Sequence, residues 1–290
     1  SYGLDESPPH HSSLTVIRQR LGGEVYERVF GLVLAALKEN KLVVGKRLGV
    51  DASVIEANAA LRSLEHRLSG DAYREYVGKL AEAAGVEASD ADAVRRFDRK
   101  RPGKKLSNAE WRNPHDPDAK IGRTKRGETR MVHKSEHVVD LDTGAIVDAD
   151  VRPGDEGDTE ALTDRLLAAE ARMNESLGTV RDRQTIESVS ADKGYFKLEE
   201  ITLLQGVGIE TVIADPNAQR RREDKLSEMD FLALEAARRS TASERGKALL
   251  RLRAELVERS FWHVLDCGGA RRTTLRGREN VRKRYLILAA

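Results

Sequence analysis

Two aspartates stand where short, mostly apolar segments end, and carboxylates in such places can hold divalent metal ions. Asp51 lies in KRLGVDASVIEANA (46–59), which is rich in β-branched residues, as is typical of a buried strand. Asp192 lies in the similar segment TIESVSADKGYF (185–196). Loops at such strand ends are where open α/β sheets place their sites. With a third carboxylate from a nearby helix, the two aspartates would supply the hard oxygen ligands that Mg²⁺ or Mn²⁺ prefers.

The third carboxylate would come from the long helix that the sequence predicts over residues 246–266. Glu255 and Glu258 lie on roughly one face of this helix, while its leucines face elsewhere. A single aspartate at a strand end is more often a solvated residue, but two of them, followed by a helix with acids on one face, form a more specific pattern. The residues alone leave both glutamates open as the third ligand.

The elements that would position these residues follow from the hydrophobic periodicity along the chain. The predicted order is helix, helix, strand, charged insertion, hairpin, helix, strand, helix, strand, polar insertion and helix. Their approximate ranges are 12–21, 23–40, 46–59, 60–130, 133–154, 158–174, 185–196, 197–208, 209–216, 217–247 and 246–266. Within the first insertion we expect helical spacing up to residue 96 and an irregular basic loop over 97–129. This order predicts an α/β fold with a mixed sheet flanked by helices.

Composition excludes several classes of protein. The single cysteine, Cys267, cannot form an internal disulfide or a cysteine metal cluster. His133 and His137 share one face of a predicted strand about 13 Å apart, too far for one zinc ion. No run of the roughly 18 apolar residues needed to span a bilayer occurs, and the polar start has no apolar signal-peptide core. We therefore expect a soluble, cytoplasmic protein with no membrane partner.

Charge alternates along the chain in blocks. Residues 95–134 carry 14 basic and 5 acidic side chains, a net of +9, whereas residues 135–178 carry 3 basic and 12 acidic, a net of −9. Residues 259–290 carry 8 basic and 2 acidic side chains, a net of +6. Basic blocks around an acid-rich segment suit a protein that binds a polyanion and keeps carboxylates for a metal. Solvated charged faces are the alternative explanation.

Four segments together resemble DDE-type insertion-sequence transposases. They cover residues 48–64 (LGVDASVIEANAALRSL), 95–147 (RRFDRKRPGKKL to TGAIV), 189–196 (VSADKGYF) and 255–287 (ELVERSFWHVLDCGG to RYLI). The resemblance extends over nearly the whole chain, and the segments occur in the family's order. It implies an α/β fold with an RNase H-like mixed five-stranded sheet flanked by helices, with helical or irregular charged insertions. Residues 1–45 would be the remnant of an end-binding region, and 46–290 the catalytic domain, with insertions at about 60–130 and 217–247.

The resemblance also assigns roles residue by residue. Asp51, Asp192 in ADKGY and Glu258 in VERSF match the catalytic acids, which would hold two Mg²⁺ ions, with Mn²⁺ as a substitute. The implied activity is cleavage and strand transfer of transposon ends into target DNA, at the nucleoid, by a homodimer. The family usually has Arg four residues before this Glu and Lys seven residues after it; here these positions are Ala254 and Leu265.

Other basic residues would then hold the DNA. Lys193 adjoins a predicted metal ligand and would contact a phosphate near the scissile bond. The remaining expected DNA contacts lie in the two basic blocks: Arg99, Lys100, Arg101, Lys104, Lys105, Arg259, Arg271, Arg272, Arg276, Arg282 and Lys283. For the tryptophans Trp111 and Trp262, core packing is favoured over stacking on a flipped base.

Two alternatives to an active transposase remain at this point. The sequence begins inside the family's end-binding region and stops after LILAA, so an inactive, truncated remnant that only binds DNA is the main one. An unrelated RNase H-like nuclease acting on RNA–DNA hybrids is the other.

Overall fold

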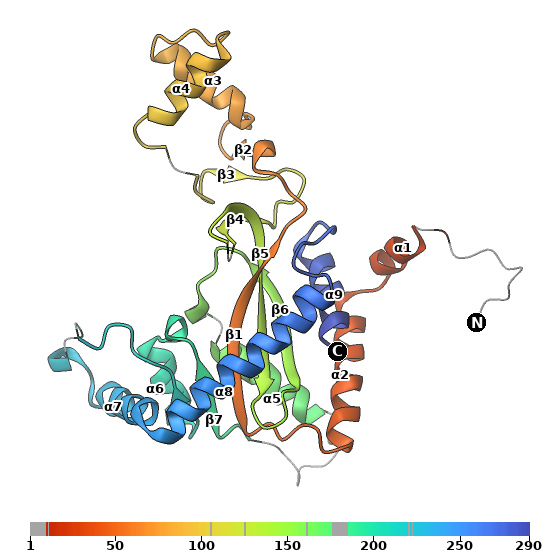
Figure 1. The fold of residues 1–290 in the computed structure, drawn as a ribbon, viewed down its shortest axis with the longest axis vertical. Coiled ribbons are helices and arrows are strands. Elements are labelled where there is room, and N and C mark those ends of the chain that lie inside the picture. The colour runs from red at the N-terminus through yellow and green to blue at the C-terminus, as the bar shows by residue number, and fades with distance from the viewer. Residues whose placement is uncertain are drawn as a thin grey trace, which may run out of the picture.

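The computed structural model describes residue 10 and residues 12–104, 106–124, 126–160, 162–175, 185–219, 221 and 223–290. Its centre is a mixed sheet with the strand order β4-β5-β1-β7-β8, in which β6 also pairs with β5 (Figure 1). The strands are β1 (Arg47–Glu56), β4 (Lys120–Arg123), β5 (Thr129–Asp140), β6 (Ile146–Pro153), β7 (Ser188–Ala191) and β8 (Glu210–Val212). The predicted five-stranded mixed sheet, β6-β5-β1-β7-β8, is therefore confirmed, and β4 adds a sixth strand.

Helices of the described part of the chain lie on both faces of this sheet and in the first insertion. They are α1 (Ser13–Arg20), α2 (Gly23–Glu39), α3 (Tyr73–Ala83), α4 (Ala91–Lys100), α5 (Leu162–Glu175), α6 (Leu198–Gly206), α7 (Glu228–Ala242), α8 (Glu244–Phe261) and α9 (Arg278–Ala289). Helices α5, α6 and α7 pack on one face, and α8 and α9 on the other. Figure 1 shows α8 crossing the sheet diagonally in front of β1.

Alternation along β1 divides its side chains between the two faces, because successive residues of a strand point in opposite directions. Val50 is buried with α5 and α6, whereas Gly49 lies against Val257 of α8. Asp51 must share the side of Gly49, and it does face α8, where it meets Arg253. The predicted strand therefore presents its carboxylate on the α8 face. The expectation that Asp51 stands at the end of this strand was wrong, because pairing with β5 carries β1 on to Glu56.

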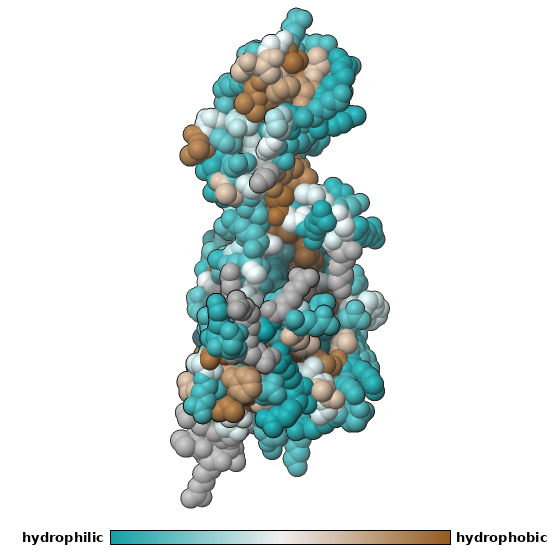
Figure 2. Space-filling view, turned by 90° about the vertical axis from the view of Figure 1, so that its left-hand side faces the viewer, coloured by the Kyte–Doolittle hydropathy of each residue, from teal (hydrophilic) through white to brown (hydrophobic). Residues whose placement is uncertain are grey.

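One expectation about the insertions was wrong, and one helix within them had not been located. The basic loop expected over 97–129 contains β4, which forms a hairpin with the start of β5 through a turn at Gly127, whose φ is +79°. The polar stretch 217–247 contains α7, because Ala233, Leu234 and Ala237 give it a buried face. Small alanines carry little hydrophobic signal, so this helix was hidden among charges. Figure 2 faces the α6–α7 side and shows apolar residues among hydrophilic ones there.

The first insertion packs around its own aromatic cluster. It contains two short strands, β2 (Glu65–His66) and β3 (Trp111–Arg112), next to α3 and α4. Trp111 is 2% exposed and contacts the rings of His66, Tyr73 and Tyr76. Core packing of Trp111 is thus confirmed. For Trp262 the same prediction was wrong, since it is 55% exposed, in the π-helical turn (Trp262–Cys267) that follows α8.

The imidazole of His137 is buried where β5 meets α8 and α9. Its Nδ1 lies 2.8 Å from Ser260 Oγ, and its Nε2 lies 2.6 Å from the hydroxyl of Tyr285. Ser260 donates its own proton to the carbonyl oxygen of Val257, so it accepts from His137. The network therefore places the His137 proton on Nδ1, and Nε2 accepts from Tyr285. Phe261 stacks on the same ring.

The pH dependence of stability should depend on His137. Burial lowers its pKa from 6.5 to about 3, so the folded protein keeps the ring neutral while the unfolded chain takes up a proton below its own pKa. Stability is therefore lost as the pH falls from 6.5 towards 3, by about 1.4 kcal/mol per pH unit from this group. Replacing His137 with Gln should remove this part of the slope in denaturant unfolding.

His263→Gln is the matched control, because His263 is exposed at the start of the π-helical turn and should leave the slope as in the wild type. An equally steep slope in His137→Gln and wild type would contradict a buried neutral ring.

Candidate active site where the pairing of β1 and β7 ends

Asp51 and Asp192 lie next to each other because their strands are parallel neighbours. Val50 of β1 pairs with Ala191 of β7, so the residue that follows each of them stands at the same level on the same face. Asp51 Oδ1 accepts a hydrogen bond from its neighbour's backbone, Ala52 N, at 2.8 Å. Asp192 Oδ1 accepts from Gly194 N at 3.0 Å. The fold thus brings together two of the three predicted catalytic acids.

The electrostatic field at Asp51 shows that further carboxylates are near. Its pKa is raised, first by burial, while Arg253 acts in the opposite direction. The negative charges of Asp192 and Asp158 raise it further. Asp158 stands at the start of a 3₁₀ turn (Asp158–Glu160), pairs with Lys134 and packs against Gly194. Sequence reasoning missed Asp158, because no strand end or motif marks it.

Arg253 is the α8 side chain that reaches Asp51. Its Nη2 lies 2.9 Å from Asp51 Oδ2, and its Nε donates to the carbonyl oxygen of Val50 at 3.1 Å. The arginine can approach because position 49 is glycine: a Cβ there would lie 3.1 Å from Arg253 Cγ and 2.7 Å from a methyl group of Leu141. Sequence reasoning did not identify Arg253, because it is one of several arginines along α8 and no motif marks it.

Glu258 and Glu255 do not face the two aspartates. At about 100° per residue, Glu258 lies about 140° and Glu255 about 160° around α8 from Arg253. Both glutamates are exposed. Among the residues that the structure describes, no group of three His, Cys, Asp or Glu side chains could hold a metal ion. The role of Glu258, or of its rival Glu255, as the third metal ligand stays a prediction.

The donor set at Asp51 and Asp192 nevertheless fits a divalent cation. Each carboxylate uses Oδ1 for a backbone N–H, which leaves Asp192 Oδ2 and, if Arg253 moves, Asp51 Oδ2. Carboxylate oxygens are hard ligands of the kind that Mg²⁺ and Mn²⁺ take. Lys193 is exposed directly beside Asp192.

The two histidines considered as a zinc pair have different partners. His133 contacts Asp116, and His137 contacts Ser260.

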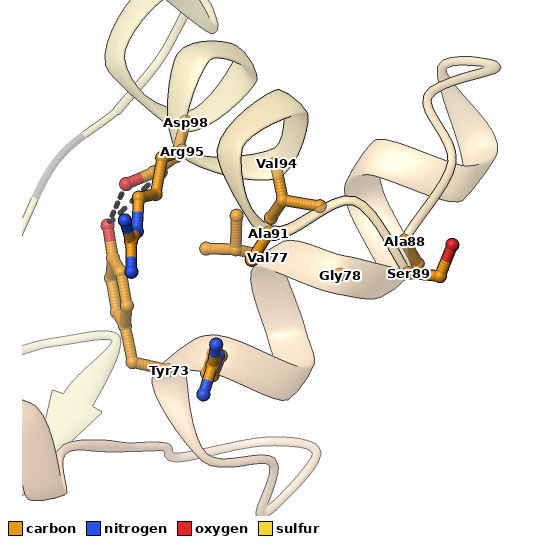
Figure 3. Close-up of a pocket in the computed structure, with 10 residues that line it drawn as sticks. Tyr73, Val77, Gly78, Ala88, Ser89, Ala91, Val94, Arg95 and Asp98 are labelled. Carbon is orange, nitrogen blue, oxygen red and sulfur yellow. Dashed lines mark hydrogen bonds between the residues drawn. The ribbon is translucent and has the colours of Figure 1, made fainter.

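The basic residues of the first insertion fall into two groups. Arg99 and Lys100 are exposed at the end of α4. Arg101 and Lys104 instead bind Asp98, at 2.8 and 2.6 Å. The carboxylate of Asp98 also accepts from the Tyr73 hydroxyl, in the hollow between α3 and α4 (Figure 3). Lys105 lies outside the described residues.

The basic residues near the C-terminus divide in the same way. Arg259 is exposed, and Arg276 is exposed with a bond from its Nε to the carbonyl oxygen of Asn58. Arg271 pairs with Asp266 at 2.6 Å, and Arg272, 74% exposed, lies 3.7 Å from Glu56.

Arg282 and Lys283 point into the protein. Arg282 bridges Asp150 and Glu27, at 2.5 and 2.6 Å, and this joins α9 to β6 and α2. Lys283 is 7% exposed and donates to the carbonyl oxygen of Arg18. These two side chains therefore have structural partners within the chain, and their contact with DNA stays a prediction.

A protein-family model matches most of this chain. The model of the family described as "Transposase DDE domain" matches residues 90–290, which include Asp192 and Glu258 but not Asp51. No curated protein matches the sequence. Among solved structures, the Mos1 transposase paired-end complex with left transposon end is similar over 94% of this chain and 67% of that chain. The identity is 9% and the TM-score 0.27, too weak a likeness to carry an argument.

None of the helices in the described part of the chain is long and apolar enough to cross a membrane.

The contact of α8 with β1 should depend on the missing side chain at Gly49. Gly49→Ala places a Cβ within 3.2 Å of Leu141, Arg253 and Val257, so it should destabilise the protein by about 1–3 kcal/mol in denaturant unfolding. Gly31→Ala is the matched control: it lies within α2 with nothing near its Cβ, and it should stabilise by about 0.5–1 kcal/mol. Equal stability of the two variants would contradict the close contact.

Proposed function

The chain belongs to the transposase DDE domain family, and we propose that it cleaves insertion-sequence ends and joins them to target DNA in a Mg²⁺-dependent reaction. The observation that carries this proposal is the pair Asp51 and Asp192, which follow the last paired residues of the parallel strands β1 and β7, Val50 and Ala191. Mn²⁺ is the expected substitute for Mg²⁺. Two DNA ends must be held together, so we also propose a homodimer acting at the bacterial nucleoid.

In this proposal the chain's own residues do three things. Asp51 and Asp192 hold the divalent ions, which activate the attacking water or 3′-hydroxyl and neutralise the leaving oxygen when bound. Lys193, exposed beside Asp192, contacts a neighbouring phosphate. The backbone N–H groups of Ala52 and Gly194 orient the two carboxylates. Glu258 is the proposed third ligand and Glu255 its rival, and either needs a change at α8 to reach the aspartates.

DNA would lie against the exposed basic residues. Among the described residues, the exposed members of the predicted set are Arg99, Lys100, Lys193, Arg259, Arg272 and Arg276. Arg101, Lys104 and Arg271 each have a carboxylate partner and would contribute less net charge. Phosphate contacts of this kind provide affinity without reading sequence.

One observation favours a second candidate function, DNA binding without cleavage. Helix α8 directs Arg253, and neither glutamate, towards Asp51. A chain fixed in this arrangement would have two acids for metal binding and no third. Such a protein would bind DNA in a salt-dependent way and show no Mg²⁺-dependent nicking.

Nicking of a plasmid that carries the gene with its flanking DNA distinguishes the two functions. Asp51→Asn and Asp192→Asn should each lower Mg²⁺-dependent nicking at least about a hundredfold, because metal ions provide several kcal/mol of transition-state stabilisation. DNA binding should persist. Asp164→Asn, an exposed aspartate on α5, is the control and should nick as the wild type does. Full nicking by either site variant would refute its role, and no nicking by the wild type would favour the binding-only function.

The same assay separates the two glutamates. Glu258→Gln should lose nicking to the same extent as Asp51→Asn, while Glu255→Gln should keep it. The reverse result would assign the third ligand to Glu255.

The salt dependence of DNA binding tests the basic surface. Each lost phosphate contact reduces the slope of log K against log salt by about 0.9, so the double variant Arg99→Gln, Lys100→Gln should flatten it by about 1.8. Fluorescence anisotropy with a labelled duplex, without divalent ions, measures this slope. Lys247→Gln is the control, because Lys247 pairs with Glu244 at the start of α8. An unchanged slope in the double variant would exclude α4 from the DNA surface.

A further inference from the structure

We propose that Arg253 is a built-in counter-ion of Asp51 that competes with the divalent ion for this carboxylate. The inference rests on the proposed function in one respect, that Asp51 and Asp192 are metal ligands. It adds a residue from α8 that regulates when the site can take metal.

The contact between Arg253 and Asp51 is anchored at two points. Arg253 Nε donates to Val50 O at 3.1 Å, which holds the guanidinium over the strand, and Nη2 lies 2.9 Å from Asp51 Oδ2. Only 11% of the arginine side chain and 30% of the aspartate side chain are exposed. A pair so shielded from water interacts more strongly than a surface pair.

The packing between β1 and α8 leaves room for the contact between Arg253 and Asp51. Glycine at position 49 leaves space for the stem of Arg253, and any Cβ there would also press on Leu141 and Val257. Two turns further along α8, Ser260 is held by the buried His137, and this fixes the rotation of the helix. The position of the guanidinium is therefore set by the packing of α8 and not by Asp51 alone.

Both oxygens of Asp51 are engaged while Arg253 is in place. Oδ1 accepts from Ala52 N, a bond within the strand that metal binding need not disturb. Oδ2 is the oxygen that an ion shared with Asp192 would use, and it faces Arg253. Arg253 Nη2 is buried and has no well-aligned hydrogen-bond acceptor, so its attraction to Asp51 is mainly coulombic. A divalent cation can replace such a contact.

The consequence is a metal affinity that is lower than two carboxylates would give by themselves. Removing the positive charge should strengthen metal binding, whereas a purely supporting role for Arg253 would make its removal weaken the site. The two roles thus predict changes of opposite sign, and neither requires catalysis to be observed.

Calorimetric titration of Mn²⁺ into the purified chain tests the proposal. Arg253→Gln removes the charge but keeps a donor for Val50, and it should bind Mn²⁺ at least about fivefold more tightly than the wild type, which is about 1 kcal/mol. Arg253→Lys keeps the charge and should bind as the wild type does. Arg251→Gln makes the same charge change at an exposed position of the same helix and should alter affinity less than twofold.

The controls separate failure of this inference from failure of the proposed function. If Asp51→Asn and Asp192→Asn leave Mn²⁺ binding unchanged, the two aspartates are not the ligands and the proposed function fails. If those variants lose binding but Arg253→Gln binds no more tightly than the wild type, the counter-ion proposal is overturned. Arg253→Met, which keeps most of the stem, provides the same comparison if thermal unfolding shows that Arg253→Gln is not folded.

Discussion

The position of β1 between β5 and β7 is the constraint on which the rest of the structure depends. It pairs with β5 over nine residues in the antiparallel direction and with β7 over four in the parallel direction. A one-residue slip in either register would turn every side chain of a strand to the other face. The parallel register aligns Asp51 with Asp192, and the antiparallel register sets Asp51 opposite His137, which anchors α8.

Helix α8 is held at several places, and together these decide which of its residues faces the acids. Gly49 admits the backbone of α8 close to β1, and His137 holds Ser260 further along. With both contacts in place the rotation of the helix is fixed, so Arg253 meets Asp51 while Glu258 faces solvent. Bringing Glu258 inward would require the helix to rotate, and the close packing at Gly49 resists this.

Much of the sheet and its helices could be predicted from sequence, because they obey simple periodicities. The strand around Asp51, the hairpin around residues 142–144 and the presence of α2 all follow from β-branched runs, a turn motif or helical spacing. Helix α7 could not be predicted, since its buried face is mainly alanine. Strand β4 also escaped prediction: a short segment with a central glycine becomes a strand only because β5 supplies its partner.

In the candidate site, the sequence predicts the features that depend on residues close together in the chain, but not the contacts between distant segments. Asp192 directly follows β7 as predicted, but Asp51 lies in the middle of β1, because pairing with β5 extends that strand to Glu56. The two aspartates are neighbours because the pairing of β1 with β7 ends at Val50 and Ala191. The ion pair of Asp51 with Arg253 joins residues two hundred positions apart and depends on a helix rotation that no local pattern encodes. Contacts between distant segments also decide which basic residues remain free to meet DNA. Arg282 and Lys283 belong to a strongly basic block in the sequence. In the fold, however, Arg282 pairs with carboxylates of α2 and β6, and Lys283 donates to a carbonyl oxygen of α1. The net charge of a segment therefore overstates the charge available to DNA, because folding removes the cations whose partners lie elsewhere in the chain.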